Sequence, residues 1–285
     1  MSISTGTHLP PLRRRQVSTR RPTNVSSTPT RVVAAGLSDA GVLRESNQDR
    51  LGIDCQRGLL VLADGVASTL QGELAADITV AQVQLHYAKM SGAIGGIVFR
   101  PGDLLEEGIH RSNQAIREVA IQGRTATTVV CMAFVKGGVH VAHVGDSRAY
   151  RFRQDRLQRL TRDHHLANAF EDELKQGTCH PDSPRSVEEI VKRLGLKHSR
   201  MHHVLTRSVG SEERVRVARG TYGRQPRDRF LLCSDGLTDM VSDGAIARIM
   251  KRYSRPEEAC QALVDAANEA GGRDNISVIV AMGLD

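Results

Sequence analysis

Apolar and polar positions alternate in short blocks along residues 32–285, and the blocks have the lengths of strands and helices. Apolar runs of strand length predict strands at 32–38, 50–55, 58–63, 126–135, 138–145, 147–153, 229–234 and 276–282. Helical spacing predicts helices at about 70–90, 103–121, 238–250 and 255–270. The order is strands, paired helices, more strands, then helices and a closing strand. It favours an α+β fold in which sheet packs on sheet with helices outside, rather than a doubly wound parallel sheet.

Two stretches of the pattern carry further expectations. The segments 126–135, 138–145 and 147–153 are joined by glycine-containing turns, so we expect an antiparallel meander. The strand pattern is then lost over about 163–204, which is polar, holds four histidines and predicts an irregular, flap-like insertion.

Aspartates stand at the ends of four apolar runs, at Asp64, Asp146, Asp235 and Asp274. An Asp-Gly pair is also a hairpin signal. After Asp64 and Asp235, however, the chain continues with helical spacing rather than with a second alternating strand. Carboxylates gathered at one rim of a sheet repel one another unless cations neutralise them, and oxygen ligands favour Mg²⁺ or Mn²⁺. The pattern therefore predicts metal-assisted hydrolysis.

Composition narrows the class of protein. The chain has 285 residues, 40% hydrophobic and 25% charged, and no stretch approaches the roughly 20 apolar residues of a membrane span. Its five cysteines are scattered and never form a CxxC pair, which favours reduced thiols and a cytoplasmic location.

The net charge of +7 comes mainly from residues 1–31, which contain six arginines and no acidic residue. This segment is rich in Ser, Thr and Pro, so we expect a disordered tail before a catalytic domain at 32–285. It could attach to nucleic acid or an anionic surface, act as a transit peptide, or have no dedicated role. A nucleic-acid-binding protein would not need the acidic strand ends, so that function is disfavoured.

Seven short motifs occur in order along the body. They are RESNQD at 44–49, ADG at 63–65, GDSR at 145–148, LTRDH at 160–164, LTRSVG at 205–210, SDGLTD at 234–239 and RDNISV at 273–278. Together they resemble the metal-dependent protein phosphatases, the type 2C serine/threonine phosphatases, in their compact bacterial form. The resemblance covers roughly residues 32–283. It implies a β-sandwich of two mainly antiparallel sheets flanked by helix pairs, in four layers α-β-β-α.

The resemblance also implies an activity and a set of roles. The activity is hydrolysis of phosphoserine and phosphothreonine in proteins by a water or hydroxide that bridges two Mn²⁺ or Mg²⁺ ions, with a possible weaker third ion. The implied partners are phosphorylated proteins and a cognate Ser/Thr kinase. The implied metal ligands are Asp49, Asp64, the Gly65 carbonyl, Asp146, Asp235, Asp239 and Asp274, and Arg44 grips the substrate phosphate.

One departure from the family pattern concerns the proton donor. Many members have a histidine after Asp-Gly, and this chain has Val66. The leaving alkoxide must then take its proton from metal-bound water or from another group, and the histidine pairs at 164–165 and 202–203 are candidates.

Two alternative functions remain open. The same metal chemistry could act on a small phosphoester. A degenerate phosphatase could bind phosphoproteins without cleaving them, although such a protein would not need to retain Asp64, Asp235 and Asp274.

Overall fold

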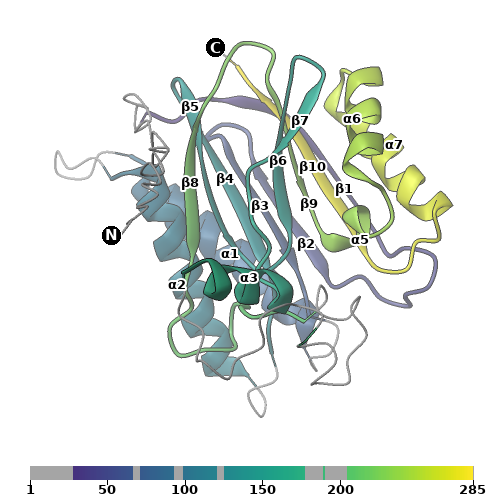
Figure 1. Ribbon diagram of the computed structural model, residues 1–285. Helices are drawn as coiled ribbons and strands as arrows, with labels where there is room; N and C mark the ends of the chain where they lie inside the picture. The colour runs from purple at the N-terminus through teal and green to yellow at the C-terminus, as the bar shows by residue number, and fades with distance from the viewer. Residues whose placement is uncertain are drawn as a thin grey trace, which may run out of the picture.

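The computed structural model describes residues 28–66, 71–92, 99–120, 125–176, 189 and 204–284 (Figure 1). In chain order the strands are β1 (Val32–Asp39), β2 (Asp49–Asp54), β3 (Leu59–Asp64), β4 (Val129–Val135), β5 (Gly138–Val144), β6 (Arg148–Arg153), β7 (Arg156–Arg159), β8 (Ala218–Gly223), β9 (Arg229–Cys233) and β10 (Ile276–Gly283). The helices are α1 (Gly72–Met90), α2 (Pro101–Val119), α3 (Leu166–Gln176), α5 (Asp235–Thr238), α6 (Asp243–Arg252) and α7 (Pro256–Glu269).

Two five-stranded antiparallel sheets face each other between helical layers. One sheet has the order β2-β3-β4-β5-β8 and the other the order β1-β10-β9-β6-β7. The pair α1 and α2 covers the outer face of the first sheet, and α5, α6 and α7 cover the second (Figure 1). The predicted α+β sandwich is therefore confirmed.

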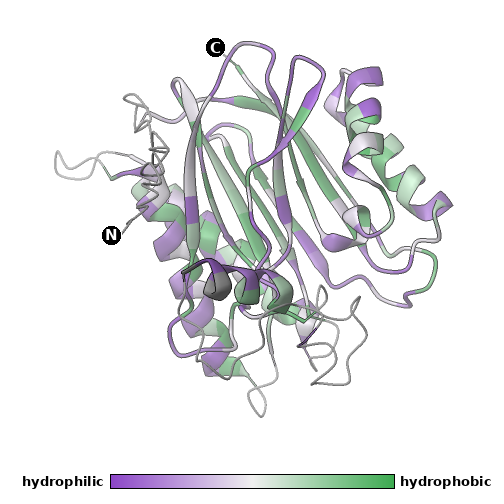
Figure 2. Ribbon diagram, viewed as in Figure 1, coloured by the Kyte–Doolittle hydropathy of each residue, from purple (hydrophilic) through white to green (hydrophobic). Residues whose placement is uncertain are grey.

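Strand alternation explains why the layers stack in this way. In β3, Leu59, Val61 and Ala63 face the α1–α2 layer, whereas Leu60 and Leu62 face the second sheet. Strands that are apolar on both faces bury both faces, as the continuous hydrophobic colour of the central strands in Figure 2 shows. The sandwich thus positions the ends of its central strands rigidly, and those ends carry the acidic residues.

The predicted meander is wrong in its third strand. β4 and β5 pair antiparallel as expected, but β6 pairs with β9 and β7 in the other sheet. The chain crosses between the sheets at Gly145, whose φ of +102° is accessible to glycine. A side chain at Gly145 would also lie 2.6 Å from the Thr128 Cβ. The crossing places Asp146 at the edge of the sandwich, between the two sheets.

The remaining differences lie in elements with weak sequence signals. The irregular insertion begins with helix α3, and the helix expected at 238–250 is two helices, α5 and α6. Strands β7 and β8 were not predicted. In α1 the apolar spacing of Leu74, Ile78 and Leu85 suggests a buried face, but Leu74 and Leu85 are exposed, whereas Val83 and Tyr87 are buried.

The first described residues already contact the body. Thr30 donates its N–H to Phe134 O (3.0 Å), and Thr28 O accepts from Lys136 N (3.0 Å). Residues 28–31 of the expected tail thus belong to the folded domain, and residues 1–27 lie outside the described residues. Within the described part of the chain, no helix is long and apolar enough to cross a membrane.

Candidate metal-dependent catalytic site

Asp49 and Asp64 face each other across neighbouring strands. Asp49 opens β2, Asp64 closes β3, and the two are register partners. Asp49 is 3% exposed, and its Oδ2 accepts a hydrogen bond from the Ser234 hydroxyl (2.9 Å). Its Oδ1 is buried and has no hydrogen-bond partner among the described residues. A buried carboxylate oxygen without a hydrogen-bond donor is an unsatisfied acceptor, and it is available to coordinate a cation.

The second sheet brings further carboxylates to the same end of the sandwich. Asp235 begins α5 directly after β9, and Asp239 donates its N–H to Asp235 O (2.8 Å), one helical turn on. Asp274 precedes β10, and its Oδ1 accepts from Asn275 N (2.8 Å). Asp146 lies on the crossing between β5 and β6. We call Asp49, Asp64, Asp146, Asp235, Asp239 and Asp274 the acidic rim.

Carboxylates of the acidic rim raise the pKa values of other members of the rim, so they are close enough to interact electrostatically. Burial and then the charge of Asp49 raise the pKa of Asp64 well above its ordinary value, and Asp235, Asp146 and Asp274 add to the shift. Burial and then Asp146 raise the pKa of Asp235 in the same way.

The pKa values of Asp49 and Asp146 are raised for the same reasons. Burial raises the pKa of Asp49 to about 6. The pKa of Asp146 is also raised to about 6, first by burial and then by Asp163 and Asp239. Burial and mutual repulsion therefore disfavour the charged forms of these carboxylates, and a bound cation would offset both effects.

The residues present fit divalent cations. All the candidate ligand atoms are oxygen atoms, which Mg²⁺ and Mn²⁺ prefer, and no described residue donates a hydrogen bond to Asp49 Oδ1. Within the described residues, Asp49, Asp64, Asp146 and Asp235 form no ion pair. No three acidic, histidine or cysteine side chains in this part of the chain already converge as a closed ligand cluster. The fit therefore rests on the shared charge and the unsatisfied oxygen.

Backbone close contacts hold the segment around Gly65. Gly65 donates its N–H to Gln48 O (3.3 Å), and a side chain at Gly65 would lie 2.5 Å from the Gly72 carbonyl carbon. Only glycine permits this approach of α1 to the end of β3. Val66, at the position of the family histidine, donates its N–H to Ala126 O (3.0 Å).

Arg44 lies at the rim. Its Nη2 donates to Asp274 Oδ2 (2.7 Å), with side-chain exposures of 39% and 38%. Beside this pair is a cleft of about 390 Å³ lined by Gly236, Asp239, Met240, Arg273 and Asp274. Larger clefts, of about 630 and 620 Å³, run along α2 and between α6 and α7, away from the rim.

Hydroxyl and amide groups that the sequence did not single out fix the rim aspartates. Ser234 bonds Asp49, the Thr127 hydroxyl donates to Asp64 O (2.7 Å), and the Thr128 hydroxyl accepts from Asp64 N (3.2 Å). Asn275 accepts from Gln48 N (2.9 Å). Ser234 and Asn275 lie in the motifs SDGLTD and RDNISV, directly next to Asp235 and Asp274. This position in the motifs is the sequence signal by which they could have been identified.

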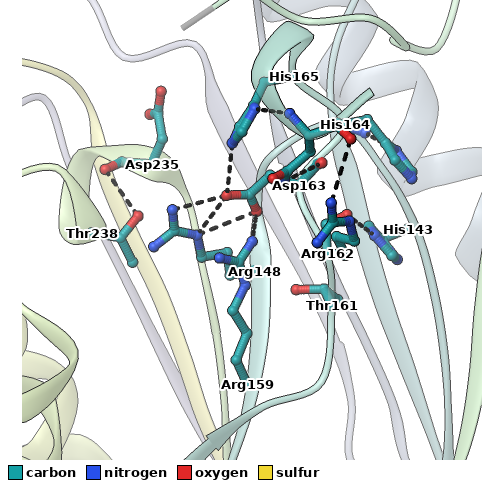
Figure 3. A network of polar contacts seen from close by, with 12 residues as sticks. His143, Arg148, Arg159, Thr161, Arg162, Asp163, His164, His165, Asp235 and Thr238 are labelled. Atoms are coloured by element: carbon teal, nitrogen blue, oxygen red, sulfur yellow. Dashed lines mark hydrogen bonds and ion pairs between the residues drawn. The ribbon is translucent and has the colours of Figure 1, made fainter. Parts of the chain in front are cut away.

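The LTRDH segment forms a separate network beside the rim (Figure 3). The buried Asp163 carboxylate accepts from Arg148 Nη2 (2.9 Å) and Nε (3.1 Å) and also from Arg159. The Arg148 guanidinium donates to Asp163 and to the Tyr150 hydroxyl (3.3 Å), so its hydrogen bonds go to these groups rather than to the neighbouring Asp146.

His164 is unsuited to donate a proton. Its Nδ1 accepts from Gly145 N (3.1 Å), and its ring stacks on His143 with centroids 4.7 Å apart. Burial, then His143 and Arg207, lower the pKa of His164 to about 3, so the ring is neutral at physiological pH. His165 contacts Asp163 (3.8 Å), and residues 202–203 lie outside the described residues.

Comparison with known proteins agrees with this geometry. The protein phosphatase 2C family matches residues 44–269. The chain belongs to the protein phosphatase 2C family. The predicted family, and with it the predicted enzyme class of protein phosphatase, is confirmed.

Individual relatives cover most of the chain. The serine/threonine phosphatase Stp of Listeria innocua is 28% identical over 251 residues, which are 85% of this chain and 92% of that protein. The Streptococcus agalactiae serine/threonine phosphatase structure has a TM-score of 0.72 at 27% identity, covering 89% of this chain and 100% of that one. The catalytic domain of the phosphatase PstP, solved with two manganese ions, has a TM-score of 0.68 at 25% identity, covering 89% and 99%.

Proposed function

We propose that this phosphatase hydrolyses phosphoserine and phosphothreonine in proteins with two Mn²⁺ or Mg²⁺ ions held by the acidic rim. The observation that carries the proposal concerns Asp49, Asp64, Asp146 and Asp235, which repel one another and form no ion pair among the described residues. Within the same part of the chain, Asp49 Oδ1 also lacks a hydrogen-bond donor. When bound, the ions would neutralise the phosphate dianion and lower the pKa of a water molecule that attacks phosphorus.

The proposed roles of the ligands are those that the family resemblance implies, and the places of these residues at the strand ends support them. Asp64, whose pKa responds to Asp49, Asp235 and Asp274, is central and would contact both ions. The Gly65 carbonyl, Asp235 and Asp274 would complete one shell, and Asp49 the other. The hydroxyls on Asp49 and around Asp64 orient these carboxylates, as outer partners of ligands commonly do.

Arg44 would bind the substrate phosphate. Its guanidinium reaches the rim through Asp274 and is partly exposed, so it can turn from that carboxylate to an incoming phosphate. A planar fork of donors matches two phosphate oxygens, which a lysine could not do.

Asp146 and Asp239 would hold a weaker third ion. Asp239 contributes to the raised pKa of Asp146, so the two charges are near each other. Asp239 lines the cleft, so water would supply most of the other ligands of this ion and its binding would be weak. With a valine at residue 66 and a neutral His164, water at this site is the proton donor that we favour for the leaving alkoxide.

Two proposals concern the partners and the location of the protein in the cell. A protein phosphatase implies phosphoprotein substrates, and we propose a cognate Ser/Thr kinase that produces them. The four described cysteines are free thiols, three of them buried, and we propose a reducing, cytoplasmic location.

One assay tests the proposed function. Hydrolysis of a phosphothreonine peptide and of an aryl phosphate is measured with Mn²⁺, with Mg²⁺ and with a chelator. We expect turnover of both substrates with metal and none with chelator. Turnover of the aryl phosphate alone would point to a small phosphoester as the substrate, and peptide binding without turnover would indicate a degenerate phosphatase.

A further inference from the structure

The turn between β1 and β2 exposes two large apolar side chains. Val42 is 63% exposed and Leu43 is 67% exposed. The other exposed large hydrophobics in the described part of the chain lie between 38% and 50%. Single exposed apolar residues are common on protein surfaces, but two adjacent ones at this level call for an explanation.

The turn is rigidly held. The N–H groups of Val42 and Leu43 both donate to Gly272 O (2.8 and 3.2 Å), and Gly41 N donates to Asp39 Oδ1 (2.8 Å). Gly41 has a φ of +78°, and a side chain there would lie 2.3 Å from Asp274 O. In Figure 1 the turn lies beside the connection from α7 to β10. The exposure is therefore a fixed feature of the backbone.

The turn adjoins the active site. Arg44 follows Leu43 directly and bonds Asp274. The segment that accepts the turn's hydrogen bonds, at Gly272, continues into Arg273 and Asp274, which line the 390 Å³ cleft together with Met240. The apolar pair therefore sits on the same side of the site as the phosphate-binding arginine.

We propose that Val42 and Leu43 bind an apolar side chain of the phosphoprotein substrate, close in sequence to the phosphorylated residue. The inference rests on the proposed function, since it assigns the substrate of that site. Successive residues of an extended peptide advance about 3.3 Å, so a residue near the phosphothreonine reaches a turn next to Arg44. A preformed apolar contact loses little conformational entropy on binding, which suits substrate recognition.

The experiment compares peptides and variants of the full chain. Two phosphothreonine peptides differ only in carrying leucine or serine at the positions flanking the phosphothreonine, and an aryl phosphate serves as the third substrate. The variants are Val42→Ser/Leu43→Ser, the milder Leu43→Ala, and Leu85→Ser as a control. Leu85 is also an exposed leucine (50%), but it lies on α1.

We expect wild type to prefer the leucine peptide about tenfold in kcat/KM, because burial of a leucine corresponds to at least that ratio. The double variant loses this preference, Leu43→Ala loses part of it, and aryl phosphate turnover and melting temperature stay unchanged. Leu85→Ser behaves as wild type.

Three results would overturn the proposal. An equal preference for the leucine peptide in wild type and in the double variant would show that Val42 and Leu43 do not contact the substrate. A parallel fall in aryl phosphate turnover would show that the pair supports the site structurally. A change of oligomeric state without a change in selectivity would show that a second copy covers the pair. Wild type that cleaves the aryl phosphate but neither peptide would instead remove the proposed function itself.

Discussion

Two sets of buried aspartates in this protein are compensated in opposite ways. Asp163 and Asp228 each have side chains that are 1% exposed and lie against arginines. Asp163 bonds Arg148 and Arg159 (Figure 3), and Asp228 bonds Arg153 (Nε to Oδ1, 2.6 Å). Asp49 is as buried as these two, since the exposure of the whole residue is 3% for Asp49, 2% for Asp163 and 3% for Asp228, but its protein partners are hydroxyls and other aspartates.

The difference separates structural from functional carboxylates. A buried carboxylate with an arginine is complete within the protein, and its removal leaves an uncompensated cation. The rim carboxylates Asp49, Asp64, Asp146 and Asp235 repel one another, and none of them forms an ion pair with an arginine or lysine among the described residues, so a cation must be added from outside the protein. The same substitution, aspartate to asparagine, should therefore have opposite effects on stability in the two sets.

The largest expected effect is on catalysis in Asp64→Asn. Loss of a shared ligand removes both the activated water and the neutralisation of the phosphate, so the rate should fall at least ~10³-fold. The metal-free variant should nevertheless melt at a higher temperature than wild type at neutral pH, because the raised pKa of Asp64 means that the metal-free fold disfavours this carboxylate relative to the unfolded chain. Aryl phosphate turnover with Mn²⁺ and thermal melting without metal are the two readouts. Full activity would remove the proposed site.

The second effect is on stability in Asp163→Asn. Arg148 and Arg159 would lose their buried partner, and we expect a loss of about 3 kcal/mol in the free energy of unfolding. Urea denaturation of the metal-free protein measures it, with Asp228→Asn as a matched variant of the other arginine-paired carboxylate. A stabilised Asp163→Asn, resembling Asp64→Asn, would contradict the distinction drawn between the two sets.

A smaller effect is expected for Arg44→Ala. A guanidinium–phosphate contact contributes ~1.5–3 kcal/mol, so kcat/KM should fall roughly 10- to 150-fold with Mn²⁺ affinity unchanged. Arg57→Ala is the control, since Arg57 also pairs with an aspartate (Asp54, 2.9 Å) but in the β2–β3 turn at the opposite end of the sandwich. If Mn²⁺ affinity falls sharply while KM stays constant, the role of Arg44 is to position the metal ligand Asp274 rather than to bind the substrate phosphate.

The smallest effect on the rate is expected for Asp146→Ala. The two-metal core should remain occupied while turnover slows, more on phosphopeptides than on an aryl phosphate with its better leaving group. Asp155→Ala, an exposed aspartate paired with Lys251, is the control. Calorimetric titration with Mn²⁺ decides: unchanged stoichiometry together with unchanged rates would exclude a third-ion role.

The sequence predicted the layers and the rim because both depend on strong local signals. Apolar runs that end in Asp-Gly gave β3 and β9 and the acids that follow them. The sequence did not predict β7, because its hairpin turns at Gln154 and Asp155, both with positive φ, without the usual glycine. It missed β8 because ARGTYG lacks an apolar run.

Long-range pairing could not be read from local pattern either. The turn at Gly145 predicts a hairpin equally well as a crossing, and only the partner β9 decides that β6 joins the second sheet. The hydroxyl of Ser234 is likewise assigned to Asp49 only when residues 185 positions apart meet. The pairing of Asp163 and Asp228 with arginines also depends on the tertiary fold and cannot be read from the local sequence.

The most direct test of the central claim is the melting temperature of the wild-type protein at pH 5 and pH 7.5, with and without saturating Mn²⁺. The pKa values of Asp49 and Asp146 are raised to about 6 in the fold, so the folded state binds more protons than the unfolded state between about pH 4 and 6. These groups therefore lower the stability of the metal-free protein as pH rises through that window. Mn²⁺, which binds the deprotonated rim, should restore it. We predict a large Mn²⁺-dependent rise in melting temperature at pH 7.5 and a much smaller one at pH 5. No rise at pH 7.5, or an equal rise at both pH values, would contradict the account.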